Sequence, residues 1–367
     1  MRPEKTILEH WKGGVRRRGG GKPTANQRVM GRDHVTSSQP IRALFPYAPL
    51  DRSFSPDESV DPLGAKNLFG QKGPTWRHLR VKMTPTFTSG KMKKMFYLVD
   101  ECAQMLTEII EQQSFGGKPI PVKETMARFT TDVISSCAFG VKSNAMTDVN
   151  SEFQLEGDDF VAQAFVFLAA GFETSSTTTT FALYELSLNL DIQNKLRHEI
   201  ITVLEKHDRK ITYDAMMEMN YLDMVVSETL RKYPALPFLD RNVQVDYKIP
   251  GTNDILEKGT TVFIPTFGIH YDPEYYPNPE KFDPERFSAK NKNDIPKYAY
   301  LPFGEGPRNC IGMRFGLMQV KTGLIHLLSK FEVSRHKETP VSIVFVTSSP
   351  TLCAVGNMPL IFNKIKG

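Results

Sequence analysis

The sequence is poor in cysteine and has no long apolar run. Four of its 367 residues are cysteines, and Cys102, Cys137, Cys310 and Cys353 stand without paired spacing. Scattered cysteines argue against a disulfide framework and favour a reducing compartment. No stretch of about twenty apolar residues occurs, so the sequence predicts no transmembrane helix, and no apolar signal-peptide core is visible near the N-terminus.

The sequence has no large excess of one charge, and it lacks several common motifs. The formal net charge is only +5, which is compatible with an acidic protein partner but too dispersed to indicate nucleic-acid binding. The sequence contains no phosphate-binding P-loop, no dinucleotide-binding glycine pattern after a strand and no histidine pair of zinc spacing. No internal repeat is evident. The length suffices for one large core or for two domains.

The first fifty residues give little structural signal. Residues 13–21 form a low-complexity segment of arginine and glycine, and this composition predicts loose coil or disorder over residues 1–50. An arm that binds a membrane surface or nucleic acid is the alternative interpretation. Ordered sequence begins near Asp51, so we expect the main domain to cover residues 51–367.

What the sequence does contain is one cysteine in an unusual setting. Cys310 lies in residues 302–312, among glycines and prolines, directly before a helical pattern that starts at Met313. Glycines allow close approach to a flat group or positive φ angles. The positive end of the following helix, together with Arg308, favours a thiolate. A lone thiolate cannot form a zinc or iron–sulfur site, which takes about four ligands, whereas a haem iron takes one axial thiolate. The alternative is a buried structural cysteine in a glycine-rich turn.

The pattern Phe303-x-x-Gly306-x-Arg308-x-Cys310-x-Gly312 resembles the haem-binding loop of cytochrome P450 monooxygenases. The resemblance implies a mainly α fold with small β-sheets (α+β), haem b as the cofactor and Cys310 as the iron ligand. It also implies that further loop residues contact the haem, namely Phe303, Gly306, Arg308, Ile311 and Gly312.

A second part of the resemblance concerns the haem propionates. Trp76 and Arg80 are four residues apart in a helical segment that a proline opens, so they share one helix face. This spacing resembles the family's Trp-x-x-x-Arg helix. The resemblance implies that both side chains, together with Arg241 and Arg308, hold the propionates. Without the family, the pair indicates an exposed arginine beside a core tryptophan.

The longest periodic stretch covers residues 158–190 and predicts a helix about 50 Å long. Gly171 in its interior costs stability and indicates close contact with another group, and Thr174 can bond back to the carbonyl of Ala170. The segment resembles the family's oxygen-binding groove. This implies that Ala170 and Gly171 contact the haem, and that Glu173 and Thr174 are the catalytic acid–alcohol pair that binds oxygen and supplies protons. Ordinary packing of small residues between helices is the alternative.

Two further segments resemble structural motifs of the family. Glu228 and Arg231 lie three apart in a helical segment, 221–232, and Arg286 lies in a Pro-Glu-Arg-Phe sequence. The resemblance implies a buried charged triad that braces the haem-side core. On its own, an exposed pair of this kind would contribute under about 1 kcal/mol.

Periodicity and turn signals predict the remaining elements. Helices are expected over residues 96–112, 124–139 and 313–331. In the second of these, the residues expected to face inward are Ala127, Phe129, Val133 and Ile134. Strands are expected at 243–247 and 260–265, and a closing hairpin at 341–346 and 352–355.

The sequence departs from the family in two places. It is most similar to insect microsomal members thought to oxidise xenobiotics, but it has the arginine-glycine segment where these carry a membrane anchor and a proline-rich hinge. Only residues 141–157 separate Gly140 from the long helix, where family members carry several helices that roof the substrate pocket. We therefore expect a cytochrome P450 fold that lacks part of the distal helical cap, with a deletion near 141–157. A splice form, a pseudogene product and a faulty gene prediction all remain open as its origin.

These features lead to three functional hypotheses. The first is a haem-thiolate monooxygenase that oxidises an apolar, xenobiotic-type small molecule with electrons from NADPH through a flavoprotein reductase. Cytochrome b5 is a further expected partner, and the expected location is the cytosolic face of the endoplasmic reticulum membrane. The second is a truncated haem-binding protein or fragment without coupled turnover. The third is a haem isomerase that uses peroxides, which need no proton delivery of the kind that Glu173 and Thr174 imply.

Under the first hypothesis, apolar side chains line the substrate pocket, and the candidates are Val166, Ala169, Ala170, Ala235 and Leu236. The reductase would dock on basic residues, and the candidates are Lys91, Lys93, Lys94, Lys297 and Arg314. The alternative for these cations is an ordinary solvated surface.

Overall fold

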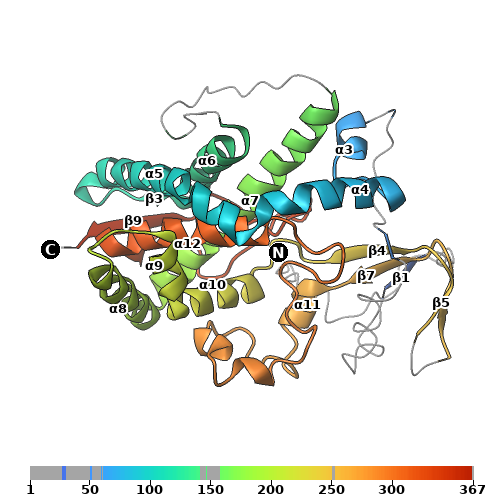
Figure 1. Ribbon diagram of the computed structural model, residues 1–367. Coiled ribbons are helices and arrows are strands. Elements are labelled where there is room, and N and C mark those ends of the chain that lie inside the picture. The colour runs from blue at the N-terminus through green and yellow to red at the C-terminus, as the bar shows by residue number, and fades with distance from the viewer. Residues whose placement is uncertain are drawn as a thin grey trace.

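Helices dominate the computed structural model of the chain, and small sheets flank them (Figure 1). The structure describes residues 27–29, 50–51, 59, 61–140, 146, 158–249 and 253–365. The expected fold class, mainly α with small β-sheets, is confirmed. Most of the expected N-terminal coil, and all but one residue of the segment 141–157, lie outside the described residues. The coil prediction is wrong at Gln27–Val29, which form a strand. No helix of the described part combines the length and the apolar character needed to cross a bilayer.

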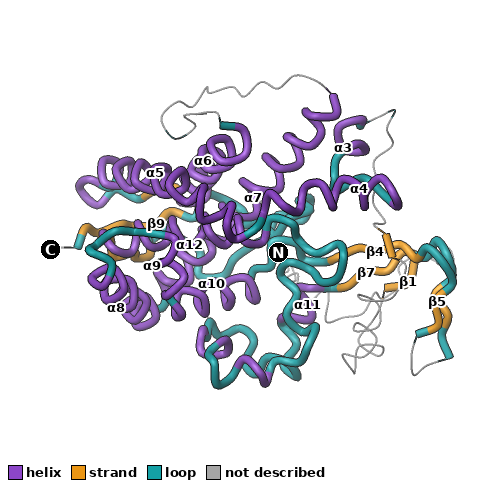
Figure 2. The backbone as a smooth tube through the Cα atoms, viewed as in Figure 1, coloured by secondary structure: helices purple, strands orange, loops and turns teal. Residues whose placement is uncertain are grey.

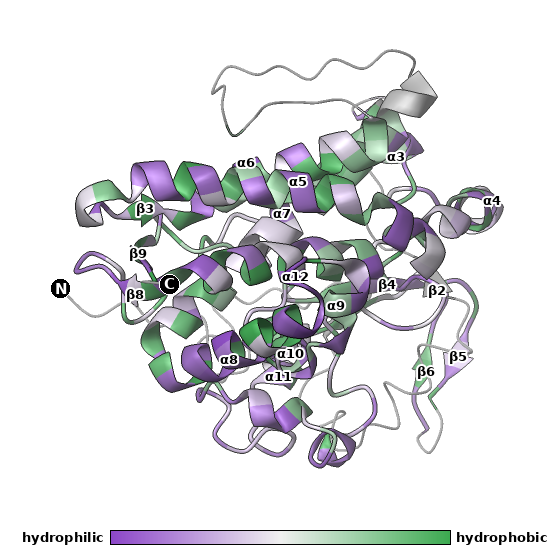
Figure 3. Cartoon of the chain, turned by 60° about the vertical axis from the view of Figure 1, so that its left-hand side comes forward, coloured by the Kyte–Doolittle hydropathy of each residue, from purple (hydrophilic) through white to green (hydrophobic). Residues whose placement is uncertain are grey.

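The long helix expected from the sequence is α7, Asp158–Leu188, and it crosses the molecule (Figure 1). Helices α6 (Val122–Ile134) and α12 (Met313–Lys330) pack on it, and α5 (Ser89–Gln113) packs on α6 and α12. Polar and apolar residues alternate along α5 and α6 (Figure 3), as expected of helices that bury one face. The main hydrophobic core lies between these helices.

Two glycines allow α6 to approach both of its neighbours closely. A Cβ atom at Gly171 of α7 would lie 2.9 Å from Cδ1 of Ile134, and one at Gly323 of α12 would lie 3.1 Å from Cε1 of Phe129. Ile134 and Phe129 both belong to α6, and both are buried. The close contact expected at Gly171 is therefore a contact with the side chain of Ile134.

The expected helix boundaries agree with the structure to within a few residues in most places. Helix α12 matches the expected segment 313–331, and α5 begins earlier than residue 96. The expected helix 124–139 is α6 followed by one π-helical turn, Ser135–Phe139. Of its expected inward residues, Phe129, Val133 and Ile134 are buried, whereas Ala127 is half-buried.

The remaining helices surround this core. Helix α10 corresponds to the expected segment 221–232, while α3, α8, α9 and α11 were not expected. Their bounds are α3 Pro62–Lys66, α4 Gly73–Met83, α8 Leu190–Lys206, α9 Tyr213–Glu218, α10 Asn220–Lys232 and α11 Thr266–His270. Short 3-10 helices lie at Thr84–Phe87, Phe115–Gly117, Pro284–Phe287 and Lys292–Asp294.

Small sheets lie on opposite sides of the helices (Figure 2). The first has the strand order β1-β7-β4-β2, with β1 Gln27–Val29, β7 Thr261–Ile264, β4 Leu239–Val243 and β2 Leu50–Asp51. In it, β4 and β7 are antiparallel, and Arg241 is opposite Val262. The second has the order β3-β9-β8, with β3 Ile120–Pro121, β9 Pro359–Lys364 and β8 Phe331–Arg335. A short pair joins β5 (Tyr247–Lys248) to β6 (Ile255–Leu256).

Two strand predictions differ from the structure. The expected strand 243–247 is interrupted, because β4 ends at Val243 and β5 begins at Tyr247. The expected hairpin at 341–346 and 352–355 reduces to one antiparallel bridge between Phe345 and Ala354. Backbone hydrogen bonds from Val346 to Cys353 and from Val355 to Val344 flank that bridge.

Candidate active site

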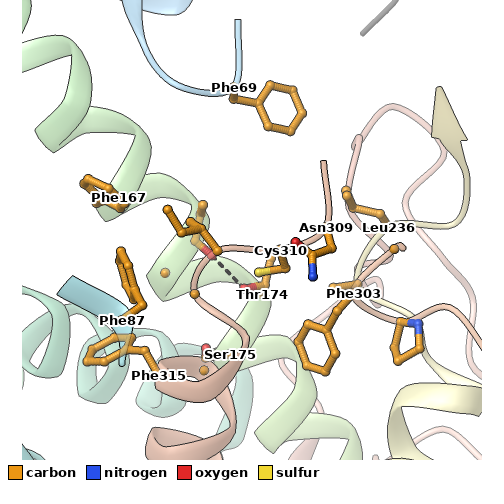
Figure 4. A pocket seen from close by; sticks show the side chains of 18 of the residues that line it. Phe69, Phe87, Phe167, Thr174, Ser175, Leu236, Phe303, Asn309, Cys310 and Phe315 are labelled. Atoms are coloured by element: carbon orange, nitrogen blue, oxygen red, sulfur yellow. Dashed lines mark hydrogen bonds between the residues drawn. The ribbon is translucent and has the colours of Figure 1, made fainter. Parts of the chain in front are cut away.

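A cavity of about 260 Å³ lies between α4, the middle of α7, the start of α12 and the loop of residues 302–312, which we call the Cys310 loop. Figure 4 shows Thr174 and Cys310 on its lining, with the rings of Phe87, Phe167 and Phe303 around them. The structure brings together at this cavity most of the site residues expected from the sequence. These are Trp76, Arg80, Val166, Ala170, Gly171, Thr174, Ala235, Leu236, Arg241, Phe303, Arg308, Cys310, Ile311 and Gly312.

Backbone hydrogen bonds give the Cys310 loop its shape. The N–H of Cys310 donates to the carbonyl of Phe303 at 2.8 Å, and the N–H of Asn309 donates to the carbonyl of Gly306 at 3.1 Å. Gly304 and Gly306 have positive φ angles of 67° and 76°, which side chains other than glycine rarely adopt. Gly306 itself does not line the cavity, so its part in the site is to make this turn.

The thiol of Cys310 lies at the cavity, directly before α12. All four cysteines are thiols without disulfide partners, and Cys310 is exposed and lines the cavity. Helix α12 begins at Met313, with Gly312 as its N-cap residue. The alternative of a buried structural cysteine does not fit this position, because the thiol faces the cavity and not the core.

Arginines gather on one wall of the cavity. Arg80 donates to the backbone carbonyl of Asn309 at 2.8 Å and to its side-chain Oδ1 at 2.7 Å. Partial burial lowers the pKa of Arg80, and the neighbouring Cys310 acts in the opposite direction. The guanidinium of Arg308 lies 3.9 Å from the centre of the Trp76 ring and donates to the carbonyl of Gln71 at 2.9 Å.

Arg241 of β4 is a third arginine that lines the cavity. It is only 3% exposed, and it donates to the carbonyl of Asp240 at 2.7 Å. Arginine forms planar, charge-assisted hydrogen bonds with carboxylates. Together with a soft sulfur atom and an apolar cavity, Arg80, Arg241 and Arg308 fit a flat iron porphyrin that carries two carboxylates.

The middle of α7 is held by side chains at three successive carbonyls. Thr174 donates to the carbonyl of Ala170 at 2.6 Å, as expected from the sequence. Gln319 of α12 donates to the carbonyl of Gly171 at 3.0 Å and also contacts the hydroxyl of Ser175. Thr130 of α6 donates to the carbonyl of Phe172 at 2.9 Å. Side-chain bonds of this kind compete with the helix ladder and loosen it locally.

The structure does not bring Glu173 or Ala169 into the cavity. Val166, Ala170 and Thr174 are four residues apart and share one helix face, whereas positions 169 and 173 lie roughly 100° away around the helix. The Oε1 atom of Glu173 accepts a hydrogen bond from the hydroxyl of Thr351 at 2.6 Å. The expected acid–alcohol pair is therefore divided in this structure, with Thr174 at the cavity and Glu173 turned toward the C-terminal segment.

Several lining residues were missed from the sequence. They include Leu68, Phe69, Phe87, Phe167, Ser175, Leu239, Asn309, Phe315 and Gln319. Phe315 and Gln319 follow Ile311 at intervals of four, so the helical period of the expected segment 313–331 could have identified them. Phe69 and Phe87 carry no such signal, because they come from loop and 3-10 segments far away in the sequence.

A buried charge cluster lies on α10, beside the lining residue Leu230. Arg231 donates to Glu228 through Nε at 2.7 Å and through Nη2 at 2.9 Å, and both side chains are fully buried. Arg286 lies 3.5 Å from Glu228, and the N–H of Asp283 donates to the same carboxylate at 2.9 Å. Burial raises the pKa of Glu228, against the lowering effect of the hydrogen bonds from Arg231. The structure thus brings together the triad of Glu228, Arg231 and Arg286.

The comparison with protein families agrees with this site. The family described as cytochrome P450 matches residues 51–158 and 144–352. Because the match covers most of the sequence, the chain belongs to the cytochrome P450 family, whose members are haem-iron monooxygenases.

Individual relatives support the same assignment and its insect character. The chain is 45% identical over 394 residues to cytochrome P450 6j1 of Blattella germanica, with 86% of this chain and 78% of that protein covered. It is 41% identical to cytochrome P450 6k1 of the same species, over the same shares. It is 40% identical to probable cytochrome P450 6a13 of Drosophila melanogaster, with 80% and 75% covered. The expected similarity to insect members is confirmed.

Both comparisons contain a break inside the chain. The family matches the chain as two separate segments, which overlap at residues 144–158. The 394 aligned residues exceed the 367 residues of this chain, although only 86% of the chain takes part. Cytochrome P450 6j1 therefore has residues inside the aligned region that have no counterpart in this chain.

Proposed function

We propose that this chain is built as a haem-thiolate monooxygenase that inserts one oxygen atom of O₂ into an apolar small molecule. The observation that carries the proposal is the position of the Cys310 thiol on the same cavity as Thr174 and the arginine wall. Electrons come from NADPH through a flavoprotein reductase, with cytochrome b5 as a further donor. The resemblance to insect microsomal members of the family implies a xenobiotic-type substrate and attachment to the endoplasmic reticulum membrane.

The lining residues fit haem b by their chemistry. Cys310 would supply the sulfur ligand of the iron, and Arg80, Arg241, Arg308 and Trp76 would hold the propionates. Phe303, Ile311 and Gly312 line the cavity and would contact the porphyrin. Bound haem supplies the oxygen chemistry, and the protein supplies binding, orientation and electrostatics.

The other cavity residues shape the reaction. Val166, Ala170, Ala235 and Leu236 give an apolar lining that favours an apolar substrate and excludes water. Thr174 offers a hydroxyl at the cavity, where it accepts a hydrogen bond, and it donates or relays a proton there once its bond to the carbonyl of Ala170 is released. Glu173 supplies protons from outside the cavity after a side-chain rotation that breaks its hydrogen bond with Thr351.

A basic surface beside the Cys310 loop provides a docking face for the reductase. Lys91, Lys93 and Lys94 are exposed at the start of α5, and Arg314 is exposed at the start of α12. Arg314 lies 3.5 Å from the carbonyl of Phe87, directly before α5, so these cations belong to one region. Asp214 pairs with Lys93 and reduces its contribution. Lys297 is also exposed and is the candidate for the edge of this face.

The test of the proposal is the reduced carbonyl complex of the haem-loaded chain. The red-shifted Soret band of thiolate ligation is expected from the natural chain and should disappear in Cys310→Ala. Cys353→Ala is the matched control, because Cys353 is half-buried and does not line the cavity. A band that survives in Cys310→Ala would remove Cys310 as the ligand.

We propose, as a second possibility, that this chain binds haem without coupled turnover. Residues 141–157 are short for a substrate-pocket roof. The division of the family match near residues 144–158 supports a deletion there, and cytochrome P450 6j1 has aligned-region residues that this chain lacks. Phe165 on α7 is 49% exposed and Phe69 is 39% exposed, which is consistent with an uncovered distal side.

Measurement of product formation distinguishes the monooxygenase from a haem-binding protein without coupled turnover. NADPH-dependent oxidation of an apolar substrate with reductase should be weak in this chain and rescued when a relative's cap replaces residues 141–157. Efficient, coupled product formation by the chain as it stands would contradict the second possibility. Conversion of an organic peroxide into its own isomer without reductase, and without oxidation of a second molecule, would instead favour the haem isomerase.

A further inference from the structure

His270 connects the buried charge cluster to the Cys310 loop. It is the last residue of α11, and its side chain is fully buried. Its Nε2 atom lies 2.9 Å from the backbone nitrogen of Leu301, and its Nδ1 atom lies 3.1 Å from the carbonyl of Arg231. Because the N–H of Leu301 can only donate, Nε2 is the acceptor. Nδ1 therefore carries the proton and donates to Arg231.

Arg231 and Tyr300 both contact His270 directly. Arg231 donates through Nη1 to the carbonyl of His270 at 2.8 Å, so the two residues hold each other's backbone carbonyls. The ring of Tyr300 stacks on the imidazole, with centres 5.5 Å apart. Burial lowers the pKa of His270 to about 3, and the charge of Arg231 acts in the same direction. The imidazole is therefore neutral near pH 7, with one donor and one acceptor, both in use.

Leu301 is the last residue before the Cys310 loop. It is 2% exposed and packs with Leu239, Tyr298 and Ala299 in a small apolar cluster. Its carbonyl accepts from the N–H of Gly304 at 3.1 Å, which belongs to the turn that positions the cysteine. Pro302 follows directly and has no N–H to offer. A buried N–H group at Leu301 that lost its acceptor would carry the full desolvation cost.

We propose that His270 is a positioning residue for the proposed iron ligand: by accepting the N–H of Leu301, it fixes the start of the Cys310 loop to the ion pair of Glu228 and Arg231 on α10. The positioning role of His270 rests on the proposed function only where it predicts the Soret band of the haem-loaded chain. The mechanical link from α10 through His270 to Leu301 concerns this chain with or without haem.

Three substitutions separate the functions of the ring. His270→Phe keeps a flat ring against Tyr300 but has neither ring nitrogen. His270→Gln has a side-chain oxygen that can reach Leu301, whereas the shorter side chain of His270→Asn can reach only toward Arg231. The comparison of Gln with Asn keeps the test valid if the Phe variant does not fold. His326→Phe is the matched control, because His326 is buried on α12 and pairs with Asp100 at 2.7 Å, away from the Cys310 loop.

The main measurement is hydrogen–deuterium exchange of peptides that cover residues 298–312 in the full chain before haem loading. Exchange of the Leu301 amide should rise by about fivefold or more in His270→Phe and His270→Asn, as expected from the loss of a buried hydrogen bond. It should stay within about twofold of the natural chain in His270→Gln and in His326→Phe. Unchanged exchange in His270→Asn, or equal exchange in the Gln and Asn variants, would overturn the proposal.

Haem-loaded protein supplies the second readout. The fraction of the carbonyl complex that shows the thiolate Soret band should fall in His270→Asn and recover in His270→Gln. If the exchange results hold but Cys310→Ala keeps the band, the proposed function is wrong and the mechanical link stands. If the band depends on Cys310 but exchange over 298–312 does not depend on His270, the positioning role is wrong.

Discussion

Removal of Glu228 should destabilise the whole domain, because it leaves Arg231 as a buried charge without a partner. Both side chains are fully buried, and two hydrogen bonds of 2.7 and 2.9 Å join them. Arg231 also donates to the carbonyls of His270, Pro279 and Lys281. In Glu228→Ala these carbonyls still hold the guanidinium in place, so it cannot easily move to solvent.

The size of the effect follows from this geometry. Breaking a buried ion pair by removing one partner typically costs about 3–5 kcal/mol, compared with a net stability of about 5–15 kcal/mol for a domain. The N–H of Asp283, which donates to Glu228 at 2.9 Å, loses its acceptor as well. Glu228→Gln keeps an oxygen for this N–H but removes the negative charge, so its cost should lie between those of the natural chain and Glu228→Ala.

Urea unfolding of the purified chain, followed by far-UV circular dichroism, measures the cost. Lys195→Ala is the control, because Lys195 pairs with Glu285 and the two side chains are 58% and 46% exposed. A pair this exposed should contribute at most about 1 kcal/mol. The reasoning would be refuted if Glu228→Ala and Lys195→Ala changed the free energy of unfolding equally, or if Glu228→Gln were as damaging as Glu228→Ala.

Three further predictions concern the cavity and pH. Replacing Arg308 and Arg241 together by Leu should lower the haem occupancy of purified protein, measured as haem per chain, and unchanged occupancy would remove both from the site. In a form of the chain in which a relative's cap replaces residues 141–157 and which forms product, Thr174→Ala should divert reducing equivalents to peroxide or water. An unaltered ratio of product to NADPH consumed would count against a role of Thr174 in oxygen activation. Because the pKa of His270 is about 3 when folded and 6.5 otherwise, the unfolded chain binds a proton that the folded chain does not. Stability should therefore fall as pH drops below 6.5, by about 1.4 kcal/mol per unit. Urea unfolding down to about pH 5 should show a shallower fall in His270→Gln, and parallel curves would contradict this.

Local sequence patterns predicted three helices closely, although α8 was missed and α5 begins at Ser89, before the expected residue 96. Helices α7, α10 and α12 carry continuous apolar periodicity, and their expected bounds differ from the observed ones by one or two residues. The short helices α3, α9 and α11 have too few turns to show a period. The pairing of β8 with β9 joins segments on either side of the C-terminal loops, so it depends on tertiary contacts that no local pattern reveals.

The site was predictable where its residues come from short motifs. Cys310, Arg308, Trp76 and Arg80 occur at fixed spacings, and the structure brings them to one cavity. The orientation of Glu173 was not predictable, because its partner Thr351 is 178 residues away. His270 carried no signal at all, since its importance comes from the two backbone groups on which its ring nitrogens act.

The two glycines that pack against α6 have a consequence for the amino-acid sequences of relatives of this chain. A Cβ atom at Gly171 or Gly323 would crowd the side chain of Ile134 or Phe129, which would have to shift. A larger residue at either glycine is best accommodated together with a smaller one at its partner on α6. We therefore expect positions 171 and 134, and positions 323 and 129, to covary in size across an alignment of insect cytochromes P450. The distances of α7 and α12 from α6 would then be preserved among relatives by paired substitutions, and not by each residue separately.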